Sequence, residues 1–324
     1  MEPAEADAIF ERVSHLVTEP EWELARPIIE EIRQLKRERG ATILAHNYQH
    51  PLIFHGVADL HGSSLGLARQ AADSDADVIV MCGVHFMAET AKLINPDATV
   101  LLPDFDAGCS LADSITAEDV QRLRDEHPGV PIVTYVNTSA GVKAASDVCC
   151  TSSNALQIVE ALNTDRVLMI PDQHLADYVD ARTDAEVLTW QGDCVVHQEF
   201  RTSDIEALRA DYPDIQVIAH PECTREVQES ADAIGSTSQL IDWVDTHRPE
   251  RVAMITECTM SDNVASRFPE VEFTQPCSLC PYMRKITLEK IRDCLREMDG
   301  KVDIDPSVAA GARNSVEKML ELSP

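Results

Sequence analysis

The sequence predicts an α/β protein of three similar αβα-layered domains with short parallel sheets, arranged around a pseudo-threefold axis with the active site at the centre. The first observation is a recurring apolar run that ends in polar residues: ATILAHNY (41–48), PIVTYVNT (131–138) and IQVIAHPE (215–222). Short β-branched runs of this kind are typical of buried parallel strands. Helical patterns separate the runs, and this alternation indicates parallel sheets joined by right-handed crossovers.

The second observation is a set of landmarks that follow each strand in the same order. A hydroxyl cluster opens a helix, a methionine is followed eight residues later by an acid, and a cysteine closes the unit. The cysteines Cys109, Cys194 and Cys280 are 85 and 86 residues apart. The other landmarks keep similar spacings; they are Ser64, Ser152 and Ser236, and Met81, Met169 and Met254. Repeated landmarks of this kind indicate repeated structural units.

The repeats predict where each unit begins and ends. We expect a first unit at 22–115, a second at 116–200 and a third at 201–299, with the C-terminal segment 300–324 packing near the first. The helix expected at 22–39 corresponds to helices that follow Thr116, Thr202 and Thr287, whose hydroxyls can cap them. Ligands of parallel sheets bind beyond the carboxyl ends of the strands. Three units around one axis would therefore bring one cysteine each to a shared site.

The stretch QPCSLCPYM (275–283) places Cys277 and Cys280 in the C-x-x-C spacing of zinc ribbons, dithiol redox centres and iron–sulfur clusters. The repeat gives Cys280 partners in Cys109 and Cys194 but gives Cys277 none. Three thiolates suit a cluster with one open iron. Zinc is the alternative, although a structural zinc site usually has four ligands in two close pairs. A dithiol centre would leave two repeat cysteines unexplained. Once a cluster is lost, the C-x-x-C spacing permits a disulfide between Cys277 and Cys280.

We expect the remaining cysteines to be small buried residues. In a chain of this kind, all ten cysteines should be reduced thiols or metal ligands rather than a disulfide framework. The six outside the C-x-x-C pair and the repeat are Cys82, Cys149, Cys150, Cys223, Cys258 and Cys294.

The charge of the chain argues against several classes of partner. The 324 residues include 56 acidic and 27 basic ones, for a net charge of −29. Such a surface repels nucleic acid and anionic membranes.

No apolar run approaches the ~20 residues of a membrane span, and the N-terminal stretch lacks signal-peptide features, so we expect a cytoplasmic protein. The acids are spread evenly and only seven residues are lysines. This pattern favours a hypothesis of adaptation to a high-salt cytoplasm.

Seven stretches together carry a resemblance to a known family: AHNYQHP, GVHFMAETAK, TYVNTSAGVKAASDV, CCTSSNA, GDCVVHQEF, AHPECTREVQESAD and CPYMRKITL. From about Ala45 to Leu322 the chain resembles the quinolinate synthases. The resemblance implies three αβα domains around a pseudo-threefold axis and a [4Fe–4S] cluster held by Cys109, Cys194 and Cys280. It implies a transferase of de novo NAD synthesis, which condenses iminoaspartate with dihydroxyacetone phosphate and releases phosphate and water. Some members carry C-x-x-C-x-x-C at the last site, whereas Thr274 occupies its first position here.

The resemblance also implies roles for individual residues. The positions expected to take part in catalysis or positioning are Tyr48, His197, His220 and Glu222, with Glu222 as the general base. Those expected to bind substrate are His46, Ser64, Tyr135, Asn137, Ser152, His220, Glu222, Ser236 and Thr237. Hydroxyls at helix N-termini suit carboxylate and phosphate groups. A serine at a helix start is most often an ordinary cap, and recurrence in three repeats is what favours binding here.

Other classes of function remain as alternatives at this point. One is an iron–sulfur redox protein or sensor without synthase activity, which would normally protect its cluster with four ligands. Another is a binding protein for phosphorylated metabolites whose cysteines hold zinc. For the synthase, the substrates are the partners implied. Because iminoaspartate is unstable, a transient contact with the enzyme that produces it is a candidate interaction.

Overall fold

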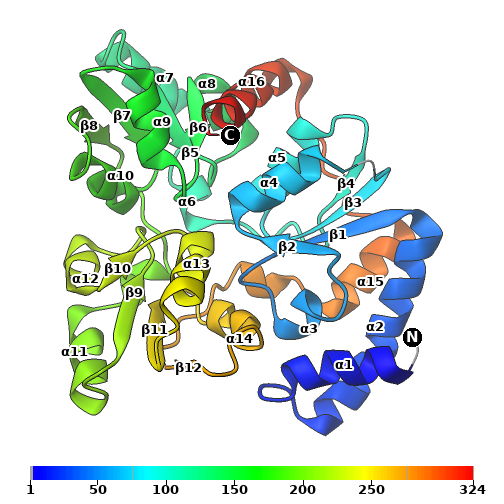
Figure 1. Cartoon of the computed structure of the whole chain (residues 1–324). Coiled ribbons are helices and arrows are strands. Elements are labelled where there is room, and N and C mark those ends of the chain that lie inside the picture. Colours follow the sequence, from blue (N-terminus) through cyan, green and yellow to red (C-terminus); the bar gives the residue numbers. More distant parts are fainter. Residues whose placement is uncertain (1–2, 75, 275, 324) are drawn as a thin grey trace.

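The computed structural model describes residues 3–74, 76–274 and 276–323 and confirms the predicted fold class. It contains three four-stranded sheets in which all strand pairs are parallel (Figure 1). Their orders are β2-β1-β3-β4, β6-β5-β7-β8 and β10-β9-β11-β12, which is one order used three times. The strands are β1 (Ala41–His46), β2 (Leu60–Gly62), β3 (Val78–Cys82), β4 (Thr99–Leu101), β5 (Ile132–Tyr135), β6 (Val148–Cys150), β7 (Arg166–Ile170), β8 (Glu186–Thr189), β9 (Gln216–Ala219), β10 (Ala233–Ile234), β11 (Arg251–Ile255) and β12 (Glu272–Phe273).

Helices connect the strands and pack on the sheets. They are α1 (Pro3–Val13), α2 (Glu19–Arg39), α3 (Pro51–Phe54), α4 (Ser64–Ala72), α5 (His85–Ile94), α6 (Ser110–Asp113), α7 (Ala117–Glu126), α8 (Ala140–Ala145), α9 (Ala155–Leu162), α10 (Gln173–Asp180), α11 (Thr202–Asp211), α12 (Arg225–Ser230), α13 (Thr237–His247), α14 (Thr259–Ala265), α15 (Leu288–Glu297) and α16 (Pro306–Leu322), with the 3-10 turns η1 (His197–Glu199) and η2 (Met283–Lys285). On the first sheet, α2 pairs with α15, a helix from the end of the third segment, and α4 pairs with α5, and both pairs contact the sheet.

The apolar runs form strands because both faces of each sheet are buried. In β9, Val217 and Ala219 belong to one hydrophobic cluster, while Ile218 between them belongs to another. Successive side chains of a strand point to opposite faces. The third sheet is therefore covered on both faces, and in β5 Ile132 and Val133 divide between two clusters in the same way. Because both faces are buried, the sequence of each strand is a continuous run of apolar residues.

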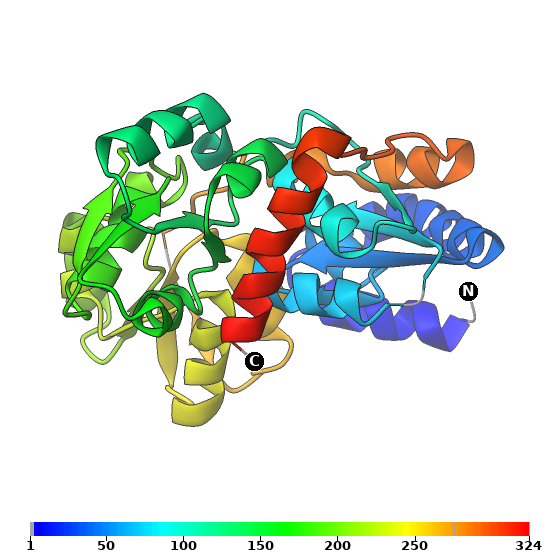
Figure 2. The same cartoon turned by 90° about the horizontal axis from the view of Figure 1, so that it is seen from above.

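The C-terminal segment closes the molecule between the first two units. Lys301 forms an antiparallel bridge with Leu101, so this part of the segment lies beside the first sheet. Helix α16 then packs chiefly against α8 and β6 of the second unit and also against α5 of the first. Figure 2 shows α16 as the red helix that runs between the two lobes. The unit boundaries at 115, 200 and 299 remain a prediction.

Local helix starts differ in detail from the expectation. Helix α2 begins at Glu19, three residues before the predicted start. Thr116 and Thr287 are the N-caps of α7 and α15, and each hydroxyl accepts a backbone N–H. Thr202 is instead the first residue inside α11, because Arg201 occupies the N-cap. The threonine rule therefore holds for two of the three helices.

One expectation about the cysteines is wrong. Cys258, expected to be a buried thiol, forms a disulfide with Cys277. Cys280 has no disulfide partner, so Cys277 does not pair with its neighbour in the C-x-x-C motif. A backbone hydrogen bond explains why Cys277 pairs with Cys258. The N–H of Cys258 donates to Ser278 O at 3.2 Å and holds the segment around Cys258 beside the segment around Cys277. The other eight cysteines are free thiols.

Candidate active site

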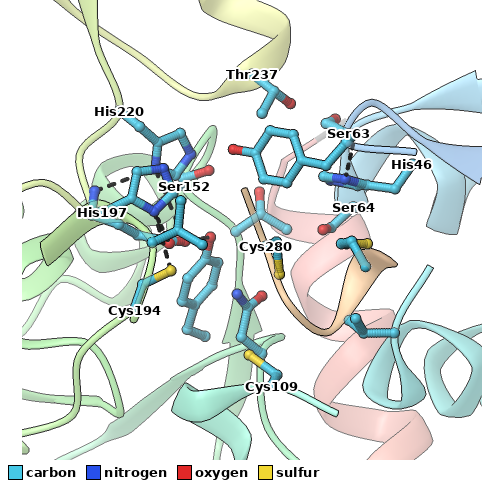
Figure 3. Close-up of a pocket in the computed structure, with 18 of the residues that line it drawn as sticks. His46, Ser63, Ser64, Cys109, Ser152, Cys194, His197, His220, Thr237 and Cys280 are labelled. Carbon is cyan, nitrogen blue, oxygen red and sulfur yellow. Dashed lines mark hydrogen bonds and ion pairs between the residues drawn. The ribbon is translucent and has the colours of Figure 1, made fainter. Parts of the chain in front are cut away.

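A central cavity lies where the carboxyl ends of the strands from all three units meet (Figure 3). The cavity and the solvent space at its mouth together hold about 740 Å³ that is not filled by protein atoms. Every site residue predicted from the sequence lines it: His46, Tyr48, Ser64, Cys109, Tyr135, Asn137, Ser152, Cys194, His197, His220, Glu222, Ser236, Thr237 and Cys280. These residues are far apart in the sequence and meet because each unit presents the same end of its sheet to the axis.

Three free cysteines, one from each repeat, border the cavity. Cys109 is the N-cap of α6, and Cys194 and Cys280 come just before the turns η1 and η2. Burial raises the pKa of Cys109 to about 12 and that of Cys280 to about 11. Burial also raises the pKa of Cys194, with the nearby Glu222 adding to the effect. A thiol of this kind becomes a thiolate when a metal displaces its proton.

Hydroxyl groups at helix starts line another part of the cavity. Ser64 and Thr237 are the first residues of α4 and α13, and Ser236 is the N-cap of α13. Ser152 departs from the expectation, because it lies in a turn before α9, which begins at Ala155. Among the described residues that line the cavity there is no Lys or Arg. Anionic ligands would therefore be met by hydroxyls, amides and helix N-termini.

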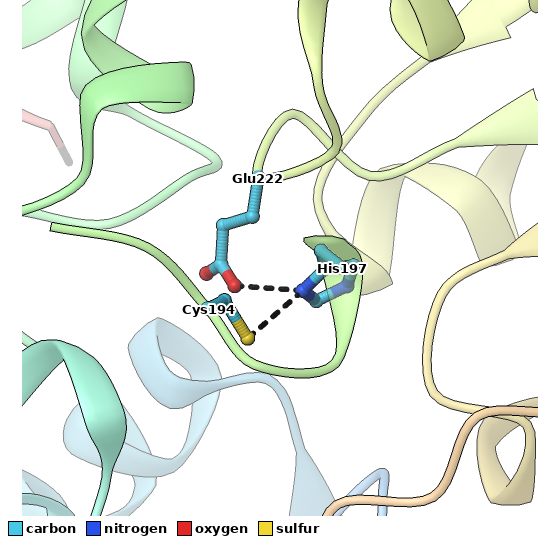
Figure 4. A group of neighbouring side chains, drawn as sticks. All are labelled: Cys194, His197 and Glu222. Atoms are coloured by element: carbon cyan, nitrogen blue, oxygen red, sulfur yellow. Dashed lines mark hydrogen bonds and ion pairs between the residues drawn. The ribbon is translucent and has the colours of Figure 1, made fainter. Parts of the chain in front are cut away.

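Glu222 is the carboxylate of the cavity and is held by two donors. Its Oε2 lies 2.9 Å from His197 Nδ1, and Tyr135 Oη donates to its Oε1. Figure 4 shows that the same Nδ1 of His197 also contacts Cys194, whose Sγ is 3.2 Å away. Burial alone would raise the pKa of Glu222, but His197 and the hydrogen bond from the Tyr135 hydroxyl outweigh burial and lower the pKa below the ordinary value of a glutamate. The side chain is therefore a carboxylate at neutral pH.

Two histidines near this carboxylate, His46 and His220, are fully enclosed by the protein. Burial lowers the pKa of His46 to about 4 and that of His220 to about 3. Both rings are therefore neutral at pH 7. His220 stacks on His197 with ring centroids 4.6 Å apart, and its Nδ1 accepts the N–H of Glu222. His46 packs edge-to-face against Tyr48 at 4.6 Å.

The loop after β5 contributes a side chain with an open hydrogen-bonding position. Asn137 Oδ1 is buried and has no hydrogen-bond partner within the described part of the chain. A buried amide oxygen without a partner is costly unless a ligand or water satisfies it. Because Asn137 lines the cavity, it has an acceptor to offer to a donor group of a ligand.

The sequence interpretation missed Thr256, which contacts two of the predicted residues. Its Oγ1 lies 2.7 Å from Tyr48 Oη and 2.9 Å from His197 Nε2. The repeat contained a usable signal, because Thr256 directly follows the strand that carries the landmark Met254. Polar residues at that strand end are candidates for the site, because ligands of parallel sheets bind beyond the carboxyl ends of the strands.

Comparisons with known proteins identify the family. The family model described as "Quinolinate synthetase A protein" matches residues 30–321. The quinolinate synthase of Agrobacterium fabrum is 55% identical over 321 residues, 99% of this chain and 93% of the relative. Quinolinate synthase 1 of Mesorhizobium japonicum is 56% identical over 97% of each chain. The quinolinate synthase of Xylella fastidiosa strain 9a5c is 58% identical over 91% of this chain and 87% of the relative.

The chain belongs to the quinolinate synthase family. The protein is thus a quinolinate synthase, an enzyme of NAD biosynthesis. This excludes the alternative of a redox protein or sensor without synthase activity. The family uses a [4Fe–4S] cluster and acts on iminoaspartate and dihydroxyacetone phosphate.

The residues present fit such a cluster. The donors are three soft sulfur atoms, each free of a disulfide and each at the edge of one cavity, and thiolates are the ligands that iron–sulfur clusters take.

Within residues 3–74, 76–274 and 276–323, no helix has both the length and the apolar character needed to cross a membrane.

Proposed function

We propose that this quinolinate synthase holds a [4Fe–4S] cluster through Cys109, Cys194 and Cys280 and joins iminoaspartate to dihydroxyacetone phosphate in the central cavity. The observation that carries the proposal is the convergence of three free thiols, from three repeats, on a cavity that also holds a buried carboxylate. With three protein ligands, the cluster supplies an open iron that acts as a Lewis acid. The protein supplies binding, orientation and proton transfer.

Binding of the anionic substrates rests on helix N-termini and hydroxyls. Ser64 belongs to the first unit, Ser152 to the second, and Ser236 with Thr237 to the third, so the hydroxyls approach the cavity from three directions. Helix N-termini favour carboxylate and phosphate because their backbone N–H groups lack partners. Asn137 adds the buried acceptor described above, which suits an imine or hydroxyl donor. Contacts from three units hold two small molecules in a fixed relative orientation, which raises the rate of their condensation.

Glu222 is the general base of this proposal. Its carboxylate is ionised at neutral pH and can accept a proton from a carbon or nitrogen of the bound intermediate. Tyr135 and His197 hold both oxygens, so the carboxylate presents one geometry to the cavity. His220 and Tyr48 complete the wall around it and orient the substrate.

Variants of four cysteines test the ligand assignment. Cys109→Ala, Cys194→Ala and Cys280→Ala should each lose the iron, the brown colour and the turnover, because two thiolates hold a cluster poorly. Cys277→Ala is the matched control, since Cys277 is neighbour to Cys280 but pairs with Cys258. We expect it to keep a brown and active protein. Iron, sulfide and the absorbance near about 400 nm are measured on anaerobically purified protein, together with quinolinate formation.

Two outcomes would contradict this assignment. Retention of the cluster in Cys280→Ala together with its loss in Cys277→Ala would move the third ligand to Cys277. Zinc in place of iron and sulfide, in protein that still makes quinolinate, would remove the cluster from the proposal.

A further inference from the structure

Three side chains of different chemistry lie close together at the cavity wall (Figure 4). Sγ of Cys194, Nδ1 of His197 and a carboxylate oxygen of Glu222 all lie within 4.8 Å of one another. The nitrogen is 3.2 Å from the sulfur and 2.9 Å from Oε2 of Glu222. Within the residues that the structure describes, this is the group of His, Cys and acidic side chains that is close enough to share one metal ion.

The fold builds this group from two segments of different units. Cys194 and His197 form a C-x-x-H motif, and the N–H of Gln198 donates to Cys194 O at 3.1 Å, which closes a turn between them. Zinc ligands are often separated by two to four residues in this way. Glu222 follows β9, and Tyr135 holds its Oε1, so its Oε2 stays beside His197.

The three donor atoms hold fewer protons than their lone pairs can accept. Glu222 is a carboxylate and only accepts, and one proton on Nδ1 serves both the sulfur and the carboxylate. A dication in this place would meet two anions once the thiol of Cys194 has lost its proton, so the site would carry no net charge. Neutrality matters because His197 and Glu222 are buried, and an uncompensated buried charge is costly.

The donor set favours zinc over the common hard cations. Thiolate sulfur, imidazole nitrogen and carboxylate oxygen are the ligands of zinc, whereas magnesium and calcium take oxygen ligands. Three protein ligands leave a fourth position, and here it would open to the cavity, as in zinc sites that keep one position for a solvent molecule. Cys194 is only partly buried, which gives an ion a path to the group.

We propose that the cluster-free protein binds one zinc ion through Cys194, His197 and Glu222, and that this zinc excludes the [4Fe–4S] cluster because both need the thiolate of Cys194. Binding releases the thiol proton of Cys194 to solvent and moves the proton of His197 from Nδ1 to Nε2, and no electron is transferred. The zinc site rests on the three contacts above. The exclusion of the cluster rests in addition on the ligand role proposed for Cys194.

Zinc titration of the full-length protein tests the site. The cluster is removed anaerobically, the thiols are kept reduced, and zinc affinity is measured by competition with a chromophoric chelator. Glu222→Gln and His197→Ala should each weaken zinc binding about tenfold or more, because even the loss of a group that only orients a ligand costs about 10–100-fold. X-ray absorption should show one sulfur at about 2.3 Å and nitrogen or oxygen at about 2.0–2.2 Å. If the parent binds zinc no more tightly than Cys194→Ala, the inference is wrong.

Cys109→Ala and Cys280→Ala separate this site from the three-thiol site. Both variants should keep the zinc affinity of the parent, because neither residue belongs to the proposed group. Cys223→Ala is the matched control, since Cys223 adjoins Glu222 in the sequence but its Sγ donates to Ile255 O. It should also bind zinc normally. Weak zinc binding in Cys109→Ala or Cys280→Ala, or three sulfur neighbours of zinc in the parent, would place the ion on the cluster thiols and overturn the inference.

Competition between zinc and the cluster tests the exclusion. An equimolar amount of zinc, added before iron and sulfide, should prevent the uptake of iron and the absorbance near about 400 nm, and a zinc chelator should restore both. In Glu222→Gln the same zinc should have much less effect. Normal cluster formation in the zinc-loaded parent would overturn the exclusion. The proposed function fails separately: a protein that binds zinc as described but takes up no cluster without zinc would contradict only the ligand role of Cys194.

Discussion

At the scale of single residues, the site depends on a carboxylate that is buried and still charged. Burying a charge is costly unless hydrogen bonds compensate it. Glu222 is compensated by Tyr135 on one oxygen and His197 on the other, while His220 lies against His197. The same hydrogen bonds that compensate the burial of Glu222 also fix the orientation of its carboxylate, as the proposed role of general base requires. Such an arrangement is typical of catalytic groups rather than of structural ones.

Glu222→Gln tests this role directly. The amide keeps the shape of the side chain but is not a base, so quinolinate formation should fall by a factor of about 10² or more. The cluster content and substrate binding should remain, which iron analysis and a binding titration would check. Glu226→Gln, an exposed glutamate on the neighbouring helix α12, serves as the control. Near-normal turnover of a cluster-replete Glu222→Gln would remove this residue from the mechanism.

At the scale of elements, the loop between β5 and α8 shows how the fold holds site residues. This loop carries Asn137 and follows Tyr135, and both side chains line the cavity. Behind it lies Lys143, which is fully buried and whose Nζ donates to the backbone oxygen of Thr138. Burial lowers the pKa of Lys143, and the nearby Glu89 opposes this effect. Glu89 also accepts the N–H of Ala140 at 3.1 Å, so both groups fix the start of α8.

Lys143→Met should therefore loosen the loop without touching a substrate. The methionine fills a similar volume but leaves the oxygen of Thr138 without its partner, so we expect a loss of about 1–3 kcal/mol in the free energy of unfolding. The KM values should rise more than kcat falls, because Asn137 is less well placed. Denaturant unfolding and steady-state kinetics measure both effects.

Lys318→Met is the control for Lys143→Met. Lys318 Nζ also donates to a backbone oxygen, that of Asp147, but at 3.4 Å and in a partly exposed place. Its substitution should change neither stability nor KM appreciably. Equal effects of the two variants would show that Lys143 has no special relation to the site.

At the scale of the whole molecule, charge is the dominant feature outside the site. With 56 acidic and 27 basic residues, most carboxylates have no cation to pair with. Ion pairs such as Arg166–Glu186 and Arg225–Glu229 lie on the surface, where each contributes little. The folded chain therefore concentrates repulsion that the unfolded chain can relieve by expanding. The hypothesis of adaptation to high salt remains a prediction that rests on this imbalance.

Added salt should stabilise the protein if the hypothesis holds. The screening length shrinks from about 10 Å at 0.1 M to about 3 Å at 1 M, which weakens repulsion between surface charges. We expect the melting temperature and the activity to rise from dilute buffer to molar potassium chloride. A melting temperature that stays flat or falls over this range would contradict the hypothesis.

The sequence by itself determined the repeat, and with it the architecture. Apolar runs such as ATILAHNY predict buried strands. The constant spacing of Cys109, Cys194 and Cys280 indicated that three units share one site. Local patterns suffice here because a strand buried on both faces must be continuously apolar. The family motifs added candidate roles for the polar strand ends, and all of those residues line the central cavity.

Only the tertiary structure decided which side chains touch across the units. The place of α16 between two units and the position of Thr256 between Tyr48 and His197 join residues of different units, and the pairing of Cys258 with Cys277 joins two separate segments of the third unit. Periodicity and spacing report the environment of a residue along its own strand or helix. They do not report the angle at which two units meet, and that angle decides whether two polar atoms come within hydrogen-bond distance.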